Sequence, residues 1–142
     1  MQEGISQTSL QPDADEQFVS LRRSLGVTTF GINQITLAPG QRLRIHRHAR
    51  QEEVYLVLEG RLTIAFDDER TELGPGELLR VAPSVRRQLM NRSHERVLLL
   101  ALGGDGEHRG RDGEAFTSWE QTTGAPPQEV PLPEDLPASE LG

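Results

Sequence analysis

The sequence predicts an all-β fold, a sandwich or barrel of seven or eight short strands. Three observations indicate it. Apolar and β-branched runs of strand length recur at roughly 10-residue spacing, and glycine, proline and aspartate lie between them. No long stretch repeats its apolar residues with the 3.6-residue period of a helix. Alternating βα units are also missing from the sequence, which argues against a doubly wound parallel sheet.

The first half of the predicted barrel begins at an ambiguous segment. Residues 18–25, FVSLRRSL, fit either a short strand or a single helical turn. Residues 28–40, TTFGINQITLAPG, are rich in β-branched residues and end in a Pro-Gly turn, so they predict a strand. Residues 42–48, RLRIHRH, alternate in character, and residues 52–60, EEVYLVLEG, are rich in valine and leucine. We expect a strand from each.

The second half continues the pattern with four more runs. Residues 61–68, RLTIAFDD, predict a strand followed by an acidic turn. Residues 73–83, LGPGELLRVAP, predict a Gly-Pro-Gly turn and then a strand, and residues 85–91, VRRQLMN, predict another. Residues 97–102, VLLLAL, form a continuous apolar run, which predicts a strand buried on both faces.

The two ends of the chain differ in composition from the middle. Residues 1–15 are polar and aperiodic, and we expect a flexible leader. Residues 16–120 are assigned to the barrel domain, with Phe116 and Trp119 packing back on it. Residues 121–142 are rich in proline and acidic residues, and such a segment cannot form a core of its own. We expect a tail that extends along the surface of a partner.

Composition excludes several classes of function. The formal net charge of −7 disfavours nucleic acid as a partner, because an acidic chain repels phosphate backbones. The chain has no cysteine, which excludes disulfides and thiolate metal sites. Its first residues lack the basic and apolar regions of a signal peptide, and no apolar run approaches the length of a membrane span. We therefore expect a cytoplasmic protein with no membrane partner.

Two histidines one residue apart suggest a metal site. Residues two apart on a strand point to the same face, so the side chains of His46 and His48 should lie side by side. Glu53 on the following strand would add a carboxylate. Two imidazoles and one carboxylate leave coordination positions open, as at non-haem iron and similar ions. The alternative is that the two histidines are solvated or serve only as hydrogen-bonding residues.

The spacing around these histidines resembles the first motif of the cupin superfamily. That motif runs glycine, five residues, HxH, three or four residues, glutamate, six residues, glycine. The matching positions are Gly40, His46, His48, Glu53 and Gly60. Glu52 also follows the histidines, but only Glu53 has the correct distance to the closing glycine. The resemblance therefore implies His46, His48 and Glu53 as the metal ligands.

The resemblance covers roughly residues 26–103 and implies a fold and a range of activities. It implies a double-stranded β-helix, or jelly-roll barrel, that forms a homodimer. The implied cofactor is one divalent ion, with iron, manganese, nickel and zinc as candidates, and the implied partner is a small molecule. Cupins of this size include dioxygenases, isomerases and decarboxylases. The wider pattern is similar to small bacterial single-domain cupins of no established activity.

The second cupin motif is incomplete in this chain. Gly76 and Asn91 have the right separation, but Ala82 stands at the proline position and Ser84 at the glycine position. Arg87 stands where the family places a fourth metal ligand, a histidine. A guanidinium remains protonated and offers no lone pair, so it cannot be a ligand.

Three arrangements of Arg87 are open at this point. In the first, three ligands hold the ion, and Arg87 leans away with Arg44 and Tyr55 to bind an anionic substrate. In the second, Arg87 pairs with Glu53, no metal binds, and the barrel holds a small anion. In the third, a one-residue slip places Arg86 inward and Arg87 in solvent.

The expected function depends on which of these arrangements Arg87 adopts. The leading hypothesis is a metal-dependent protein, such as a dioxygenase or isomerase, that acts on a small anionic molecule. The rival is a metal-free module that binds small anions around an Arg87–Glu53 ion pair. A structural or partner-binding barrel is the third class. The remaining histidines are assigned no role, because His94 lies in a predicted surface turn and His108 in a charged loop.

Overall fold

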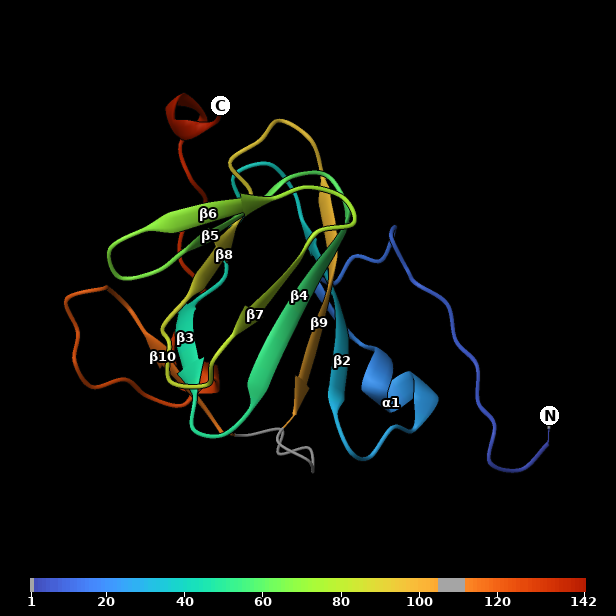
Figure 1. The fold of residues 1–142 in the computed structure, drawn as a ribbon. Helices are drawn as coiled ribbons and strands as arrows, with labels where there is room; N and C mark the ends of the chain where they lie inside the picture. Colours follow the sequence, from blue (N-terminus) through green and yellow to red (C-terminus); the bar gives the residue numbers. More distant parts are fainter. Residues whose placement is uncertain (1, 105–111) are drawn as a thin grey trace.

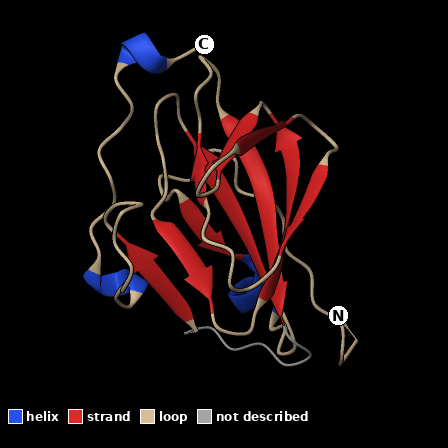
Figure 2. Cartoon of the chain, turned by 60° about the vertical axis from the view of Figure 1, so that its left-hand side comes forward, coloured by secondary structure: helices blue, strands red, loops and turns tan. Residues whose placement is uncertain are grey.

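The computed structural model describes residues 2–104 and 112–142. Figure 1 shows strands arranged as two walls that face each other, and Figure 2 shows the same walls from the side. One wall is a five-stranded sheet in the order β1-β2-β9-β4-β7. The other consists of the pair β10-β3 and the three-stranded sheet β6-β5-β8, which the isolated bridges Arg42–Met90 and His46–Arg87 join together. All strand pairs are antiparallel. The predicted double-stranded β-helix is confirmed.

The described residues contain ten strands and three short helices. They are β1 Phe18–Ser20, α1 Leu21–Leu25, β2 Gly31–Leu37, β3 Ile45–His48, β4 Glu52–Glu59, β5 Leu62–Ala65, β6 Arg70–Leu73, β7 Leu78–Val81, β8 Gln88–Met90, β9 Val97–Gly104, β10 Gly113–Phe116, and the 3₁₀ turns η1 Pro127–Glu129 and η2 Ala138–Glu140. Two of the strands, β6 and β10, have no counterpart in the sequence prediction. Both are four residues long and too polar to stand out as apolar runs.

The ambiguous segment at residues 18–25 contains both predicted elements. Strand β1 ends at Ser20, whose side chain caps the one-turn helix α1. The helix stops at Gly26, which has a φ of 76°, a left-handed conformation that favours glycine. The buried side chain of Leu21 fixes the helix against the barrel.

The core lies between the two walls. Inward-facing residues of both walls pack together there and are almost fully buried: Ile35, Leu37, Tyr55, Val57, Leu62, Ile64, Leu73, Val81, Leu89, Val97, Leu99 and Ala101. The opposite face of the five-stranded sheet is also aliphatic, but Val54, Leu56, Leu100 and Leu102 are only half-buried. Burial of β9 on both faces is therefore only partly borne out.

Both ends of the chain contact the barrel. In the leader, the backbone of Gln11 exchanges two hydrogen bonds with the side chain of Gln34. In the tail, Val130 is buried, and the N–H of Leu136 donates to the carbonyl of Gly40 at 2.7 Å. The tail thus runs along its own barrel (Figure 1), whereas the sequence suggested the surface of a partner. Among the described residues, no helix has the length and apolar character that a membrane crossing requires.

Candidate metal centre

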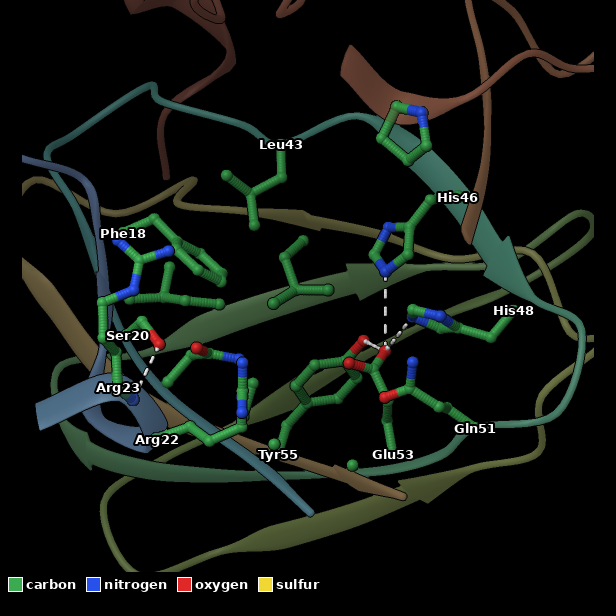
Figure 3. A pocket seen from close by; sticks show the side chains of 17 residues that line it. Phe18, Ser20, Arg22, Arg23, Leu43, His46, His48, Gln51, Glu53 and Tyr55 are labelled. Carbon is green, nitrogen blue, oxygen red and sulfur yellow. Dashed lines mark hydrogen bonds and ion pairs between the residues drawn. The ribbon is translucent and has the colours of Figure 1, made fainter. Parts of the chain in front are cut away.

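A cavity of about 400 Å³ opens between the walls at one end of the barrel. Figure 3 shows the imidazoles of His46 and His48 and the carboxylate of Glu53 on one side, and Phe18 and Arg23 on the other. A volume of this size suits a small molecule. The cavity is the place in the fold where the predicted ligands can meet a substrate.

Backbone pairing brings the three predicted ligands together. His46 and His48 lie two residues apart on β3, and β4 places Glu53 opposite them. The Nε2 atoms of His46 and His48 lie 3.5 Å and 3.2 Å from Oε1 of Glu53. Ligand atoms about 2.1 Å from a common ion are about 3.0 to 3.4 Å apart in octahedral or tetrahedral geometry. The spacing is therefore close to that of three ligands around one ion.

Both imidazoles are held with Nε2 toward the cavity. Nδ1 of His48 lies 2.7 Å from Oδ1 of Asp112, and Nδ1 of His46 lies 3.2 Å from the carbonyl oxygen of Arg44. Each Nδ1–H thus has an acceptor, which leaves the Nε2 lone pair for a metal. Nε2 of His48 is buried, and its close contact among the described residues, Oε1 of Glu53 at 3.2 Å, lacks the geometry of a hydrogen bond. A divalent ion would satisfy this atom, so the residues present fit the metal that the motif implies.

The electrostatics of the cluster favour an ionised carboxylate. Burial raises the pKa of Glu53, but the close contacts and charge interactions of its carboxylate with His46 and His48 outweigh burial and hold that pKa well below its usual range. Burial lowers the pKa of His48, while its contacts with Glu53 and Asp112 raise it more. Burial raises the pKa of Asp112, but donation from the N–H groups of Arg50 and Gln51 holds it below the ordinary value.

Arg87 lies beneath the cluster and is fully buried. Its Nη2 donates to Oε1 of Glu53 at 2.7 Å, and its Nη1 donates to the carbonyls of Val85 at 2.6 Å and Pro83 at 3.2 Å. The predicted Arg87–Glu53 ion pair is present. The register slip that would expose Arg87 is wrong, and so is the expectation that Arg87 leans into the cavity toward a substrate.

Tyr55 belongs to the same buried network. Its hydroxyl donates to Oε1 of Glu53 at 2.6 Å and accepts from Nε of Arg87 at 3.2 Å. Burial and the neighbouring carboxylate raise the pKa of Tyr55 well above its usual value. The hydroxyl therefore orients Glu53, and Tyr55 also lines the cavity, so its expected contact with substrate stays a prediction. Tyr55 and Arg87 both donate to Oε1 of Glu53, and no described residue donates to Oε2 of that carboxylate.

Arg44 does not line the cavity, contrary to the inward direction expected from its alternation with His46. Two backbone hydrogen bonds explain why: the N–H of Leu43 donates to the carbonyl of Leu89, and that of His46 donates to the carbonyl of Arg87. Between these two bonds, Arg44 and Ile45 thus oppose the single residue Gln88, a local bulge that shifts the alternation. Leu43 and His46 both face the cavity, and Nε of Arg44 donates to the tail at Val130.

Several polar residues of the site, among them Asp112, Arg22 and Arg23, escaped sequence reasoning. Asp112 reaches His48 because Gly113 on β10 pairs with His48 on β3, a contact between positions 64 residues apart. Arg22 and Arg23 reach the cavity from α1. No local pattern marks any of them. The exposed position expected for His94 is confirmed, and His108 lies outside the described residues.

Comparison with known proteins identifies the family of the chain. The family model described as "Cupin domain" matches residues 33–103, half of the chain. An uncharacterized protein of Methanocaldococcus jannaschii is 31% identical over 52 residues, which span 37% of this chain and 42% of that relative. The chain thus matches about two fifths of the length of this curated relative.

Two solved structures share the fold. A cupin protein of Bacteroides fragilis superposes with a TM-score of 0.66 at 26% identity, covering 87% of this chain and all of the other. A protein described as a sugar phosphate isomerase, from Silicibacter pomeroyi, gives a TM-score of 0.62 at 23% identity over 88% of this chain and 82% of its own, which shows the fold alone. With the matched motif, the barrel and the histidine–glutamate cluster, the chain belongs to the cupin superfamily.

Proposed function

We propose that this cupin binds one divalent ion through His46, His48 and Glu53 and a small anionic molecule beside it. The observation that carries the proposal is the state of the two imidazoles. Both present Nε2 to one carboxylate oxygen, and among the described residues the buried Nε2 of His48 makes that contact without forming an aligned hydrogen bond. Burying a nitrogen without a partner costs free energy, and a metal ion removes that cost.

The donor set indicates which ions fit. Two imidazole nitrogens and one carboxylate suit iron, manganese, nickel or zinc and leave coordination positions for water or substrate. When bound, such an ion supplies Lewis acidity or, if it is redox-active, activation of oxygen. These options correspond to a metal-dependent enzyme of the isomerase or dioxygenase type acting on a small substrate.

The chain's own residues have distinct tasks in this proposal. Asp112 accepts a hydrogen bond from Nδ1–H of His48 and so fixes its tautomer. Tyr55 and Arg87 hold Glu53 in place through Oε1, and Oε2 faces no competing donor within the described chain. Apolar side chains such as Leu43 and Leu89 form part of the cavity wall and limit water around the cluster.

Arg87 also makes the site favourable for an anion. Its fixed positive charge balances the charge of Glu53 at 2.7 Å. A divalent ion and the carboxylate of Asp112 would then leave about one net positive charge. A carboxylate or phosphate beside the ion would neutralise it. Arg87 thus influences the ligand through its charge, without touching it.

A metal-free module that binds anions is the second candidate, and the Arg87–Glu53 ion pair is the observation that favours it. The carboxylate already has a cationic partner, and that cation repels a second one. In this case a protonated His48 would take the place of the ion, in line with its raised pKa. Metal content separates the two candidates.

The experiment uses full-length protein purified without a histidine tag. Elemental analysis after exposure to iron, manganese, nickel and zinc salts is expected to give about one ion per chain. The variant His46→Ala should lose the ion. His94→Ala is the matched control, because that imidazole is exposed and is not part of the cluster. Metal-free protein after every exposure, with no difference between wild type and His46→Ala, would overturn the proposal.

A further inference from the structure

The side of the cavity away from the metal cluster carries two arginines. Arg22 and Arg23, both on helix α1, line the cavity near Phe18, and Figure 3 shows Phe18 and Arg23 across the cavity from His46 and Glu53. Neither guanidinium has a carboxylate within 4.0 Å among residues 2–104 and 112–142. The chain carries a net charge of −7, so unpaired arginines beside a cavity require an explanation.

Helix α1 fixes the position of Arg22. The side chain of Leu21 is 4% exposed and anchors the helix in the core. The N–H groups of Gly26 and Val27 both donate to the carbonyl of Arg22, at 2.8 Å and 3.1 Å, and close the turn. Nη1 of Arg22 then donates to the carbonyl of Val27 at 3.2 Å. The guanidinium is therefore held in advance of any ligand, which lowers the entropy cost of binding.

The surroundings of the two arginines leave their charge uncompensated. Glu53 is the single acidic residue among the described cavity-lining residues, and Arg87 already pairs with it. The other polar groups on that side, such as Asn33 and Ser20, are neutral. The cavity thus has a cationic end at α1 and a metal-ligand end at β3 and β4.

We propose that Arg22 and Arg23 bind a phosphate or carboxylate at the far end of a small ligand whose near end reaches the His46–His48–Glu53 cluster. The second half of this statement rests on the proposed function, and the first half does not. Two guanidiniums that line one cavity match a dianion, so phosphate is the better fit. The ligand class is a short molecule with an oxygen donor at one end and an anionic group at the other.

Isothermal titration of phosphoglycolate and of succinate into full-length, zinc-loaded protein tests the proposal. Arg22→Gln and Arg23→Gln should each weaken binding about tenfold, as expected for one charged hydrogen bond. Arg22→Lys should recover part of the loss. Arg70→Gln is the matched control, since Arg70 is an exposed arginine on β6, away from the cavity, and it should bind like wild type. Because Arg23 is itself exposed, Arg23→Gln remains informative if Arg22→Gln fails to fold.

The possible results have distinct meanings. Tighter binding of phosphoglycolate than of succinate, with loss in both variants, supports a phosphate group, and the reverse order supports a carboxylate. Equal binding by wild type and a variant that combines Arg22→Gln with Arg23→Gln, or no binding of either compound by wild type, overturns the arginine site. Zinc affinity should be unchanged in all variants. If wild type takes up no zinc but binds phosphoglycolate through both arginines, the proposed function fails and the arginine site stands.

Discussion

Asparagine at position 112 would test how the chain prepares His48 for a metal ion. Oδ1 of Asp112 lies 2.7 Å from Nδ1 of His48, while Oδ2 accepts from the N–H groups of Arg50 and Gln51 at 2.9 Å and 2.8 Å. Asparagine has one oxygen, and the two backbone donors hold it in the Oδ2 position. Its amide group then donates toward Nδ1, which favours the tautomer with the proton on Nε2. That nitrogen no longer offers a lone pair.

The expected loss follows from the role of such partners. Removing the acceptor behind a metal-binding histidine weakens metal affinity about 10-fold to 100-fold, or about 1.4 to 2.8 kcal/mol. Competition between Asp112→Asn and a chromophoric chelator for zinc measures the dissociation constant. Glu114→Gln is the matched control. Glu114 lies on β10, two residues after Asp112, and accepts from Nε of Arg47 at 2.7 Å, but it contacts neither histidine.

Two results would refute this reasoning. If Asp112→Asn bound zinc as tightly as wild type, Asp112 would serve only to anchor the backbone at Arg50 and Gln51. If Glu114→Gln lost as much affinity as Asp112→Asn, the effect would reflect lost negative charge in general and not the tautomer of His48.

Three further predictions concern stability and assembly. Arg87→Met should lower the free energy of unfolding, measured by urea titration, by about 3 to 5 kcal/mol, because it leaves Glu53 buried without its cation. Adding Glu53→Gln to the Arg87→Met chain should recover part of this loss. Because the pKa of Glu53 is held below its ordinary value of 4.5, the stability that its ionised form contributes is present above that pH and lost as pH falls through the folded-state pKa. Metal-free wild type should therefore lose melting temperature on acidification more steeply than Glu53→Gln, and parallel curves would contradict this. Light scattering of wild type should give about twice the chain mass of 15.8 kDa. Leu100→Arg places a charge on the aliphatic outer face of the five-stranded sheet and should give the mass of a single chain. A wild-type monomer would refute the predicted homodimer.

The three candidate ligands could be predicted because their relation is local. His46 and His48 depend only on the alternation within one strand, and Glu53 lies on the next strand at the motif's spacing. The same alternation fails for Arg44, because a bulge lies between Leu43 and His46. A single extra residue reverses the direction of a side chain, and nothing in the sequence RLRIHRH marks it.

The rest of the site depends on contacts between distant segments. Asp112 meets His48 through the pairing of β10 with β3, and Arg22 and Arg23 meet the cavity because Leu21 docks α1 on the core. The motif placed Arg87 near Glu53. The burial of Arg87, however, depends on carbonyls in the loop before β8, which accept hydrogen bonds from its guanidinium. Sequence patterns report local periodicity, and these positions are set by tertiary packing.

Anomalous diffraction from a crystal of the metal-loaded protein tests the central claim most directly. Data collected at the absorption edge of the bound metal should show one strong peak about 2.1 Å from Nε2 of both His46 and His48 and from an oxygen of Glu53. No peak at this cluster after exposure to iron, manganese, nickel and zinc, or a peak that only one of the three side chains contacts, would contradict the account.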